Sequence, residues 1–209
     1  MVNTIIFDMG DVFLNKDKQA KVAALENIGI FDWNDDLEKL EEKLETGKID
    51  GDEYLTGMQK HSNGASIEAV KDAWNAGITD FPLYRLEFLQ KLKENYRLFL
   101  LSNTDPIHIE KFEDEAGASF YSDFYQCFEK VYFSHEIGVR KPNADAFNYV
   151  LNNHQDIQPK RTLMVDDKKF NTDAAAELGF LVWNLQKGDE DVVDLFEKSV
   201  LKESEESKK

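Results

Sequence analysis

The sequence predicts an α/β protein with a parallel five-stranded sheet core and an inserted α-helical domain. Five short apolar runs are typical of strands, and they occupy residues 4–7, 97–101, 130–133, 162–165 and 180–183. A helical pattern follows each of the last four runs, and this alternation favours a parallel sheet. Residues 15–90 carry helical patterns without a clear strand, which indicates that the inserted domain follows the first strand.

The first apolar run ends at an aspartate. Residues 4–7 read T-I-I-F, which suits a central parallel strand that is covered on both faces. Asp8 follows directly, and Gly10-Asp11 is a turn signal. A carboxylate at the carboxyl end of such a strand lies where open α/β sheets form their ligand crevice. Taken alone, Asp8 could equally be a turn residue or a helix cap.

Capping residues divide the inserted segment into several helices. Asn34 or Asp35 and Ser66 suit helix N-caps, and Gly29 and Gly47 suit helix ends. We therefore expect residues 15–90 to form one helical domain, and residues 1–14 and 91–209 to form the core. Near the other end of the chain, we expect a last helix at 189–200 and a disordered polar tail at 202–209.

Composition narrows the possible partners. The chain has 209 residues, with 25 Lys plus Arg against 41 Asp plus Glu, so the formal net charge is −16. This charge argues against nucleic acid and anionic membranes as partners, although one local pocket can still bind a small anion. The single cysteine, Cys127, cannot form an internal disulfide, and no secretion signal or membrane span is evident. We expect a cytoplasmic protein.

Polar residues cluster where three of the predicted strands end. Asp8 follows the first strand, Ser102-Asn103-Thr104 the second, and Asp166-Asp167 the fourth, while Lys141 comes after the third. If these strands are neighbours, the clusters face one crevice. Burying carboxylates together is costly, and a divalent cation offsets the repulsion. Oxygen ligands without His or Cys indicate Mg²⁺. A cation, a lysine and a hydroxyl group together make a phosphate-binding site. In such a site Asp8 could attack phosphorus as a nucleophile.

Four segments carry a family resemblance. They are F-D-M-G-D-V at 7–12, L-L-S-N-T at 100–104, G-V-R-K-P at 138–142 and M-V-D-D-K-K-F-N at 164–171. In this order and spacing the chain resembles the haloacid dehalogenase-like (HAD) hydrolase superfamily. The insertion is similar to the small α-helical cap of subfamily I. The residues of the first two motifs resemble those of the branch that holds α-glucose-1-phosphate phosphatases and epoxide hydrolase phosphatase domains. The resemblance implies a Rossmann-like core.

The resemblance also implies a role for each motif residue. A Mg²⁺-dependent phosphatase would act on a small phosphorylated metabolite, such as a sugar phosphate, through an aspartyl-phosphate at Asp8, as a monomer or weak homodimer. Ser102 and the amide of Asn103 would hold phosphoryl oxygens, and Lys141 would neutralise charge. The implied metal ligands are Asp8, the carbonyl of Gly10, and Asp167, with Asp166 as an alternative or supporting ligand.

Gly10 departs from the family pattern and keeps other functions open. Most phosphatases of this superfamily have a second Asp at this position, which acts as general acid/base. Glycine offers a backbone carbonyl for the metal but no proton. Asp11 is one residue too far along the chain to take the place of that Asp. We therefore expect a slower enzyme, a leaving group that needs little protonation, or a donor elsewhere. A metal-independent 2-haloacid dehalogenase is one alternative, although the acidic pair Asp166-Asp167 disfavours it. A catalytically silent HAD-like binding or regulatory protein is another. A phosphoglucomutase-like transfer is disfavoured, because the acid/base that is missing at Gly10 is central to it.

Several other polar and aromatic residues are expected to have structural roles. The four histidines lack ligand spacing and suit surface or loop positions. Glu41, Glu42 and Glu45 suit a solvated helix face. We expect packing roles for Trp33, Trp74 and Trp183.

Overall fold

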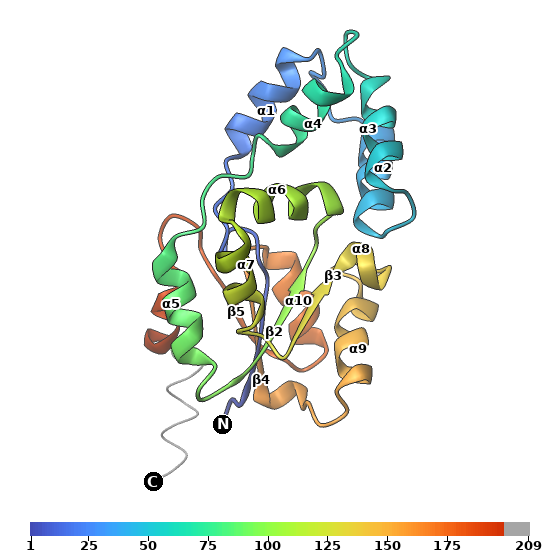
Figure 1. Cartoon of the computed structure of the whole chain (residues 1–209). Coiled ribbons are helices and arrows are strands. Elements are labelled where there is room, and N and C mark those ends of the chain that lie inside the picture. Colours follow the sequence, from blue (N-terminus) through green and yellow to red (C-terminus); the bar gives the residue numbers. More distant parts are fainter. Residues whose placement is uncertain (199–209) are drawn as a thin grey trace.

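A computed structural model describes residues 1–198, and its core is a parallel sheet with helices on both faces (Figure 1). The strand order is β3-β2-β1-β4-β5, and every neighbouring pair is parallel. The strands are β1 (Thr4–Phe7), β2 (Arg97–Ser102), β3 (Lys130–Phe133), β4 (Thr162–Asp166) and β5 (Leu181–Asn184). The Rossmann-like five-stranded sheet predicted from the sequence is confirmed.

Strand β1 lies in the middle of the sheet. All four of its residues are buried, as expected for an apolar strand that is covered on both faces. Phe7 lies opposite Leu100 of β2 and Val165 of β4. The residues that follow these three strands therefore emerge side by side at one edge of the sheet.

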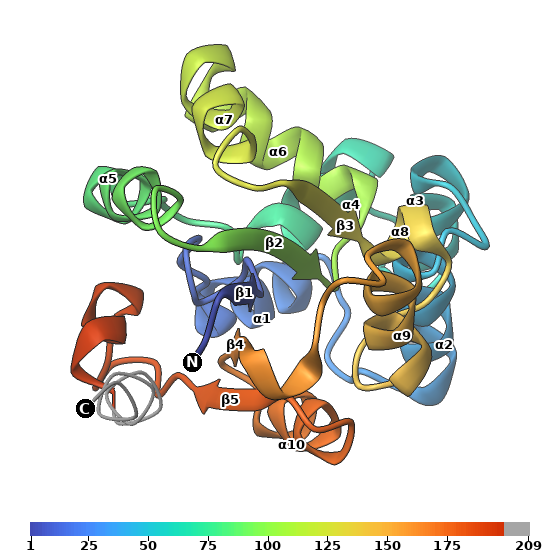
Figure 2. The ribbon, with the colours of Figure 1, turned by 90° about the horizontal axis from the view of Figure 1, so that it is seen from below.

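Helices cover the two faces of the sheet in separate groups (Figure 2). One face carries α5 (Leu83–Leu92), α7 (Ala118–Tyr125) and a 3₁₀ helix at Val192–Glu197; the other carries α9 (Ala144–Asn153) and α10 (Lys169–Glu177). Alternate β1 residues face the two layers, so Ile5 and Phe7 pack on the first and Ile6 on the second. The shorter elements are α8 (Ser134–Ile137) and a 3₁₀ turn at Pro159–Arg161.

Four helices of the inserted segment form a cap above the carboxyl ends of the strands (Figure 1). They are α1 (Lys18–Asn27), α2 (Asp35–Glu45), α3 (Gly51–Gln59) and α4 (Ile67–Asn75). Each begins after a side-chain N-cap that accepts backbone N–H groups, namely Asp17, Asn34, Asp50 and Ser66. The cap has a hydrophobic cluster of its own, built around Tyr54, Met58 and Trp74.

Helix α6 contacts both parts, whereas helix α5 packs on the core. Helix α6 (Pro106–Ala116) contributes Ile107 to the cap cluster and Phe112 to the core cluster. Helix α5 directs three leucines, at 86, 89 and 92, into the core cluster. The division into residues 1–14 plus 91–209 and a cap of 15–90 stays a prediction, and the packing of α5 favours a boundary before Leu83.

Two helices differ from the sequence-based expectation. The last helix, expected at 189–200, is a 3₁₀ helix at Val192–Glu197, which opens with a capping box at Asp191. The rest of that prediction, and the tail at 202–209, lie outside the described residues. Helix α7 was not expected, because its sequence A-S-F-Y-S-D-F-Y is poor in strong helix formers; packing of Phe124 in the core cluster stabilises it. In the described part of the chain, no helix is both long and apolar enough to cross a membrane.

Candidate active site

A buried lysine joins two strand-end carboxylates. Lys141 Nζ lies 2.8 Å from Asp8 Oδ1 and 2.6 Å from Asp166 Oδ2. The lysine side chain and that of Asp166 are fully buried, and the Asp8 side chain is 10% exposed. Asn103 positions the lysine, because its side-chain amide accepts the Lys141 N–H at 2.9 Å and donates to the Lys141 carbonyl at 2.7 Å. The end of β2 thus fixes a residue that is far away in sequence.

The two aspartates after β4 differ in their surroundings. Asp166 accepts hydrogen bonds from Lys141 Nζ, from Asn171 Nδ2 at 3.0 Å and from the Lys168 N–H at 2.9 Å. It therefore orients the lysine and the start of α10. The Asp167 carboxylate accepts no hydrogen bond from the described residues and lines the pocket above Asp8. Asp167 is thus the freer of the two to take a ligand.

The electrostatics of the site favour an added cation. Burial, together with the charges of Asp8 and Asp166, raises the pKa of Asp167 to about 6. Burial also acts to raise the pKa of Asp8, but Lys141 and Lys16 outweigh this and hold it below its ordinary value. Burial acts to lower the pKa of Lys141, and the carboxylates of Asp166 and Asp8 outweigh it and raise that pKa.

The three aspartates suit a small hard cation. Asp8, Asp166 and Asp167 can each bring one carboxylate oxygen to within 4.8 Å of the others. The donor set is entirely oxygen, which Mg²⁺ prefers, and a cation here would offset the repulsion that raises the pKa of Asp167. The residues present therefore fit a magnesium ion.

The remaining predicted residues lie at the same edge of the sheet. Ser102 ends β2 and is 3% exposed. Together with Gly10 and Asn103 it lines a narrow hollow beside Asp8's loop. Asp11 occupies the turn after β1 with a φ of 56°, so its interpretation as a turn residue is confirmed. The structure thus brings all the sequence-predicted site residues together.

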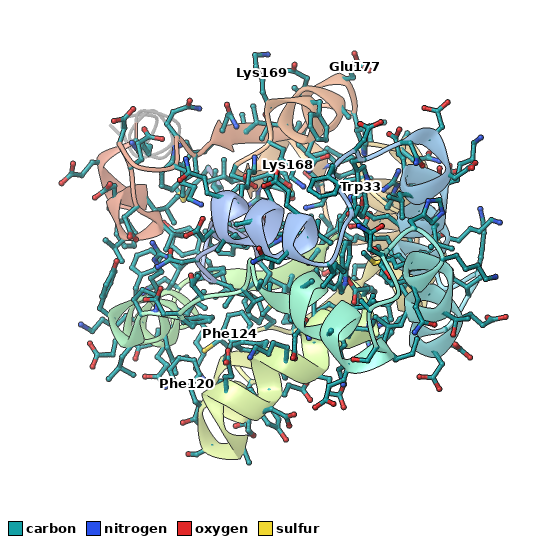
Figure 3. All side chains as sticks on the ribbon, turned by 90° about the horizontal axis from the view of Figure 1, so that it is seen from above. Trp33, Phe120, Phe124, Lys168, Lys169 and Glu177 are labelled. Atoms are coloured by element: carbon teal, nitrogen blue, oxygen red, sulfur yellow. The ribbon has the colours of Figure 1, made fainter. Side chains whose placement is uncertain are left out.

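A pocket of about 230 Å³ separates these groups from the cap. The cap side contributes Lys21, Glu41 and Trp74, while the core side contributes Asp8 and Asp167. Seen from the cap side, Lys168 lies near the middle of the molecule, whereas Lys169 and Glu177 lie at its outer edge (Figure 3). The pocket is large enough for a small metabolite, and it carries both positive and negative groups on its cap side.

Sequence reasoning missed the cap residues of this pocket. The interpretation of Glu41, Glu42 and Glu45 as a solvated face is wrong for two of the three. Glu41 faces the pocket, where burial raises its pKa, and Glu45 accepts from Arg140 Nη1 of the core at 2.7 Å with a side chain only 16% exposed. Helical spacing places these glutamates on one face, but it does not show that the core lies opposite.

Where the cap meets the core, two aromatic side chains, Trp74 of α4 and His108 of α6, contact Asp105. Trp74 packs as expected, and its Nε1–H donates to Asp105 Oδ2 at 3.3 Å. His108 stacks on Trp74 with ring centroids 4.8 Å apart, and its Nδ1 lies 2.8 Å from Asp105 Oδ2. The expectation of a surface or loop position is wrong for His108, which is part of the cap–core contact.

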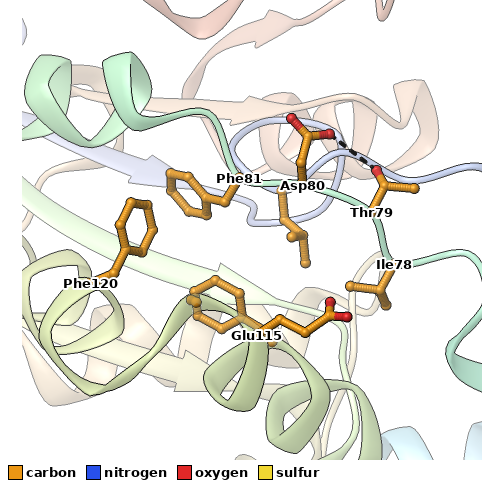
Figure 4. A pocket seen from close by; sticks show the side chains of 9 residues that line it. Ile78, Thr79, Asp80, Phe81, Glu115 and Phe120 are labelled. Atoms are coloured by element: carbon orange, nitrogen blue, oxygen red, sulfur yellow. Dashed lines mark hydrogen bonds between the residues drawn. The ribbon is translucent and has the colours of Figure 1, made fainter.

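A second hollow, of about 560 Å³, lies between the linker that joins α4 to α5 and the helices α6 and α7 (Figure 4). Its lining includes Phe81, Phe120, Asp80 and Glu115. None of the described residues that line it is a lysine or an arginine, so it does not suit a phosphate group.

Comparisons with known proteins agree with this geometry. A family model described as haloacid dehalogenase-like hydrolase matches residues 2–179. D-ribitol-5-phosphate phosphatase from Bacteroides thetaiotaomicron is 28% identical over 194 residues, which cover 90% of this chain and 94% of that enzyme.

Solved structures extend the similarity to the whole fold. A HAD family enzyme from Bacteroides thetaiotaomicron, crystallised with magnesium and inorganic phosphate, is 30% identical with a TM-score of 0.81, covering 94% of this chain and 100% of that one. A predicted HAD-like family hydrolase from Porphyromonas gingivalis is 26% identical with a TM-score of 0.76, covering 90% of this chain and 93% of that one. The chain belongs to the haloacid dehalogenase-like hydrolase family.

Proposed function

We propose that the protein is a Mg²⁺-dependent phosphatase that hydrolyses a small phosphorylated metabolite through an aspartyl-phosphate at Asp8. The observation that carries this proposal is the group of three aspartates around Lys141 at the carboxyl end of the parallel sheet. In this proposal Asp8 attacks phosphorus, Asp167 helps to hold a cation and Asp166 orients Lys141. Lys141 keeps Asp8 ionised for the attack.

Each residue has a defined task in this reaction. Asp8 Oδ attacks phosphorus, and the bond from phosphorus to the leaving oxygen breaks. Lys141, Ser102 and the amide of Asn103 hold the phosphoryl oxygens, and water then hydrolyses the acyl phosphate to restore Asp8. Asp8, the Gly10 carbonyl and Asp167 would hold the Mg²⁺, with Asp166 orienting Lys141. When bound, Mg²⁺ neutralises charge on the phosphoryl group.

A sugar-alcohol phosphate is the proposed substrate class. The relative that is 28% identical over 90% of this chain carries the name D-ribitol-5-phosphate phosphatase. The cap side of the pocket suits such a substrate, because Glu41 can accept hydrogen bonds from hydroxyl groups and Lys21 can donate them. Trp74 closes the pocket, and its ring lies 3.4 Å from Lys21 Nζ.

The proposal is tested by phosphate release from a panel of esters. The panel contains ribitol 5-phosphate, ribose 5-phosphate, glycerol 3-phosphate, glucose 1-phosphate and p-nitrophenyl phosphate, each with Mg²⁺ or with EDTA. We expect the wild type to release phosphate only with Mg²⁺, and to prefer ribitol 5-phosphate. Asp8→Asn should abolish release, whereas Asp173→Asn, an exposed change on α10, should leave it unchanged.

Three outcomes would contradict parts of the proposal, and a fourth would contradict its reaction class. Release in EDTA would exclude the metal role, and release by Asp8→Asn would exclude the nucleophile. Equal rates for all esters would exclude recognition by the cap. If no ester is turned over, the reaction class itself is wrong.

A further inference from the structure

The side chain of Lys16 covers Gly10 on the side where any other residue would place its Cβ. An ideal Cβ built on Gly10 would lie 2.5 Å from Lys16 Cε and closer still to Nζ. Gly10 is only two residues from Asp8, and both line the pocket together with Lys16. The absence of a side chain at position 10 therefore leaves room for an ammonium group beside the candidate nucleophile.

The loop that carries Lys16 is held in place by a second lysine and an aspartate. The Lys16 N–H donates to Asp11 Oδ1 at 2.9 Å, and Lys187 Nζ lies 2.7 Å from the same Asp11 oxygen. Lys187 Nζ also donates to the Lys16 carbonyl. Asp11 adopts its left-handed backbone conformation at this point. These contacts fix the backbone of Lys16, and its ammonium group has no carboxylate partner among the described residues.

The other candidate proton donors around the pocket have different surroundings. Lys141 Nζ is held between Asp8 and Asp166, and Lys21 Nζ lies against the ring of Trp74. His108 has Nδ1 beside Asp105 and Nε2 at 3.1 Å from the Trp74 carbonyl. Lys168 is exposed and lines the same pocket, but it is not among the nearest atoms to a Cβ built on Gly10. Among the described residues, Lys16 is thus the cation whose side chain lies directly against Gly10.

We propose that the Lys16 ammonium group is the proton donor for the leaving oxygen of the substrate. The inference rests on the proposed phosphatase function. As Asp8 attacks, the phosphorus–oxygen bond to the leaving group breaks and its electron pair stays on that oxygen. Lys16 Nζ gives this oxygen a proton, which releases an alcohol. The neutral amine then takes a proton from the water that hydrolyses the phosphorylated Asp8, which restores the ammonium group.

The test compares two leaving groups that differ in their need for a proton. The alkoxide of an alkyl phosphate must be protonated as it leaves, whereas p-nitrophenolate is stable without a proton. We expect Lys16→Met to lower kcat/KM for the best alkyl phosphate by about 10²–10⁴-fold, and for p-nitrophenyl phosphate by less than about tenfold. Lys39→Met, an exposed change on α2, is the matched control and should alter neither.

A second variant moves Lys16 without removing its charge. Gly10→Ala keeps the backbone carbonyl but pushes away the flexible end of Lys16, so it should reproduce the selective loss for the alkyl ester while the thermal midpoint stays close to that of the wild type. Melting curves identify any variant that fails to fold.

The outcomes separate this inference from the phosphatase proposal. Equal losses on both esters would show that Lys16 binds the phosphoryl group instead, and would overturn the inference. A selective loss in Lys168→Met, with none in Lys16→Met, would also overturn it. A wild type without turnover of either ester overturns the phosphatase proposal and this inference with it.

Discussion

Replacing Lys141 with methionine should destabilise the fold strongly. The change keeps most of the aliphatic side chain but removes an ammonium group that lies fully buried within 2.8 Å of one carboxylate and 2.6 Å of another. Removing one member of a buried ion pair costs about 3–5 kcal/mol, because the remaining charge is left without compensation. In a domain of this size, about 1 kcal/mol shifts the thermal midpoint by about 2–4 °C. Lys141→Met should therefore lower it by about 6–20 °C.

Urea denaturation in EDTA at pH 7.5 measures this loss. Lys169→Met is the matched control, because it breaks a lysine–aspartate pair whose side chains are 74% and 58% exposed. The control should lose less than about 0.5 kcal/mol. The double variant Lys141→Met/Asp166→Asn should lose less free energy of unfolding than the two single variants lose together. The reason is that it leaves one unpaired buried carboxylate fewer than Lys141→Met does. A loss below about 1 kcal/mol in Lys141→Met would refute the buried, charged arrangement.

Three further predictions concern the cap and its contact with the core. Glu41→Gln should raise KM for the preferred polyol phosphate about tenfold or more, because a hydrogen bond to a charged group contributes about 1.5–3 kcal/mol. The KM for p-nitrophenyl phosphate should not change. Equal effects on the two esters in steady-state kinetics would refute this. Burial lowers the pKa of Lys21 to about 8, so KM for the polyol phosphate should rise above pH 8 in the wild type, and a KM–pH profile of Lys21→Met should lack that rise. Burial acts to raise the pKa of Asp105, but His108 outweighs burial and holds this pKa below its ordinary value. The ionised Asp105 carboxylate therefore stabilises the fold fully above about pH 4, and this stabilisation is lost as the pH falls through the lowered pKa. In urea titrations between pH 3 and 6, the free energy of unfolding of Asp105→Asn should fall less steeply with decreasing pH than that of the wild type. An equal slope for the two proteins would contradict the prediction.

The sequence predicts the core because its signals are local. Strand β1 is a continuous apolar run, and the run ends at Asp8 where the strand ends. Asn34, Ser66 and Asp105 cap helices by accepting backbone N–H groups within three residues. The family resemblance is confirmed by the match over residues 2–179.

The site was predicted where a motif lies beside a strand end, and was missed where tertiary packing decides. Lys16 and Lys21 occur in an ordinary lysine-rich stretch, and only the folded chain brings them over Gly10 and Trp74. Glu41 has the spacing of a solvated helix face, and it faces the pocket because the cap folds back over the sheet. Periodicity identifies a face of a helix, but it does not identify what lies opposite that face.

The contacts of the two tandem aspartates favour the order of ligands that the family resemblance implies. That resemblance implies Asp167 as a direct metal ligand, with Asp166 as an alternative or supporting ligand. Asp166 accepts from Lys141, Asn171 and the start of α10, whereas the Asp167 carboxylate accepts from none of the described residues. These contacts leave Asp167 as the freer ligand and make Asp166 the residue that orients Lys141.

Trapping the covalent intermediate tests the central claim most directly. The wild-type protein is mixed with Mg²⁺ and its best substrate, quenched during turnover and treated with borohydride, which converts a phosphorylated aspartate to homoserine. Mass spectrometry of the peptide that contains residues 4–14 then reads position 8. We predict homoserine at Asp8 only when both Mg²⁺ and substrate are present. An unmodified Asp8 during sustained phosphate release would contradict the account.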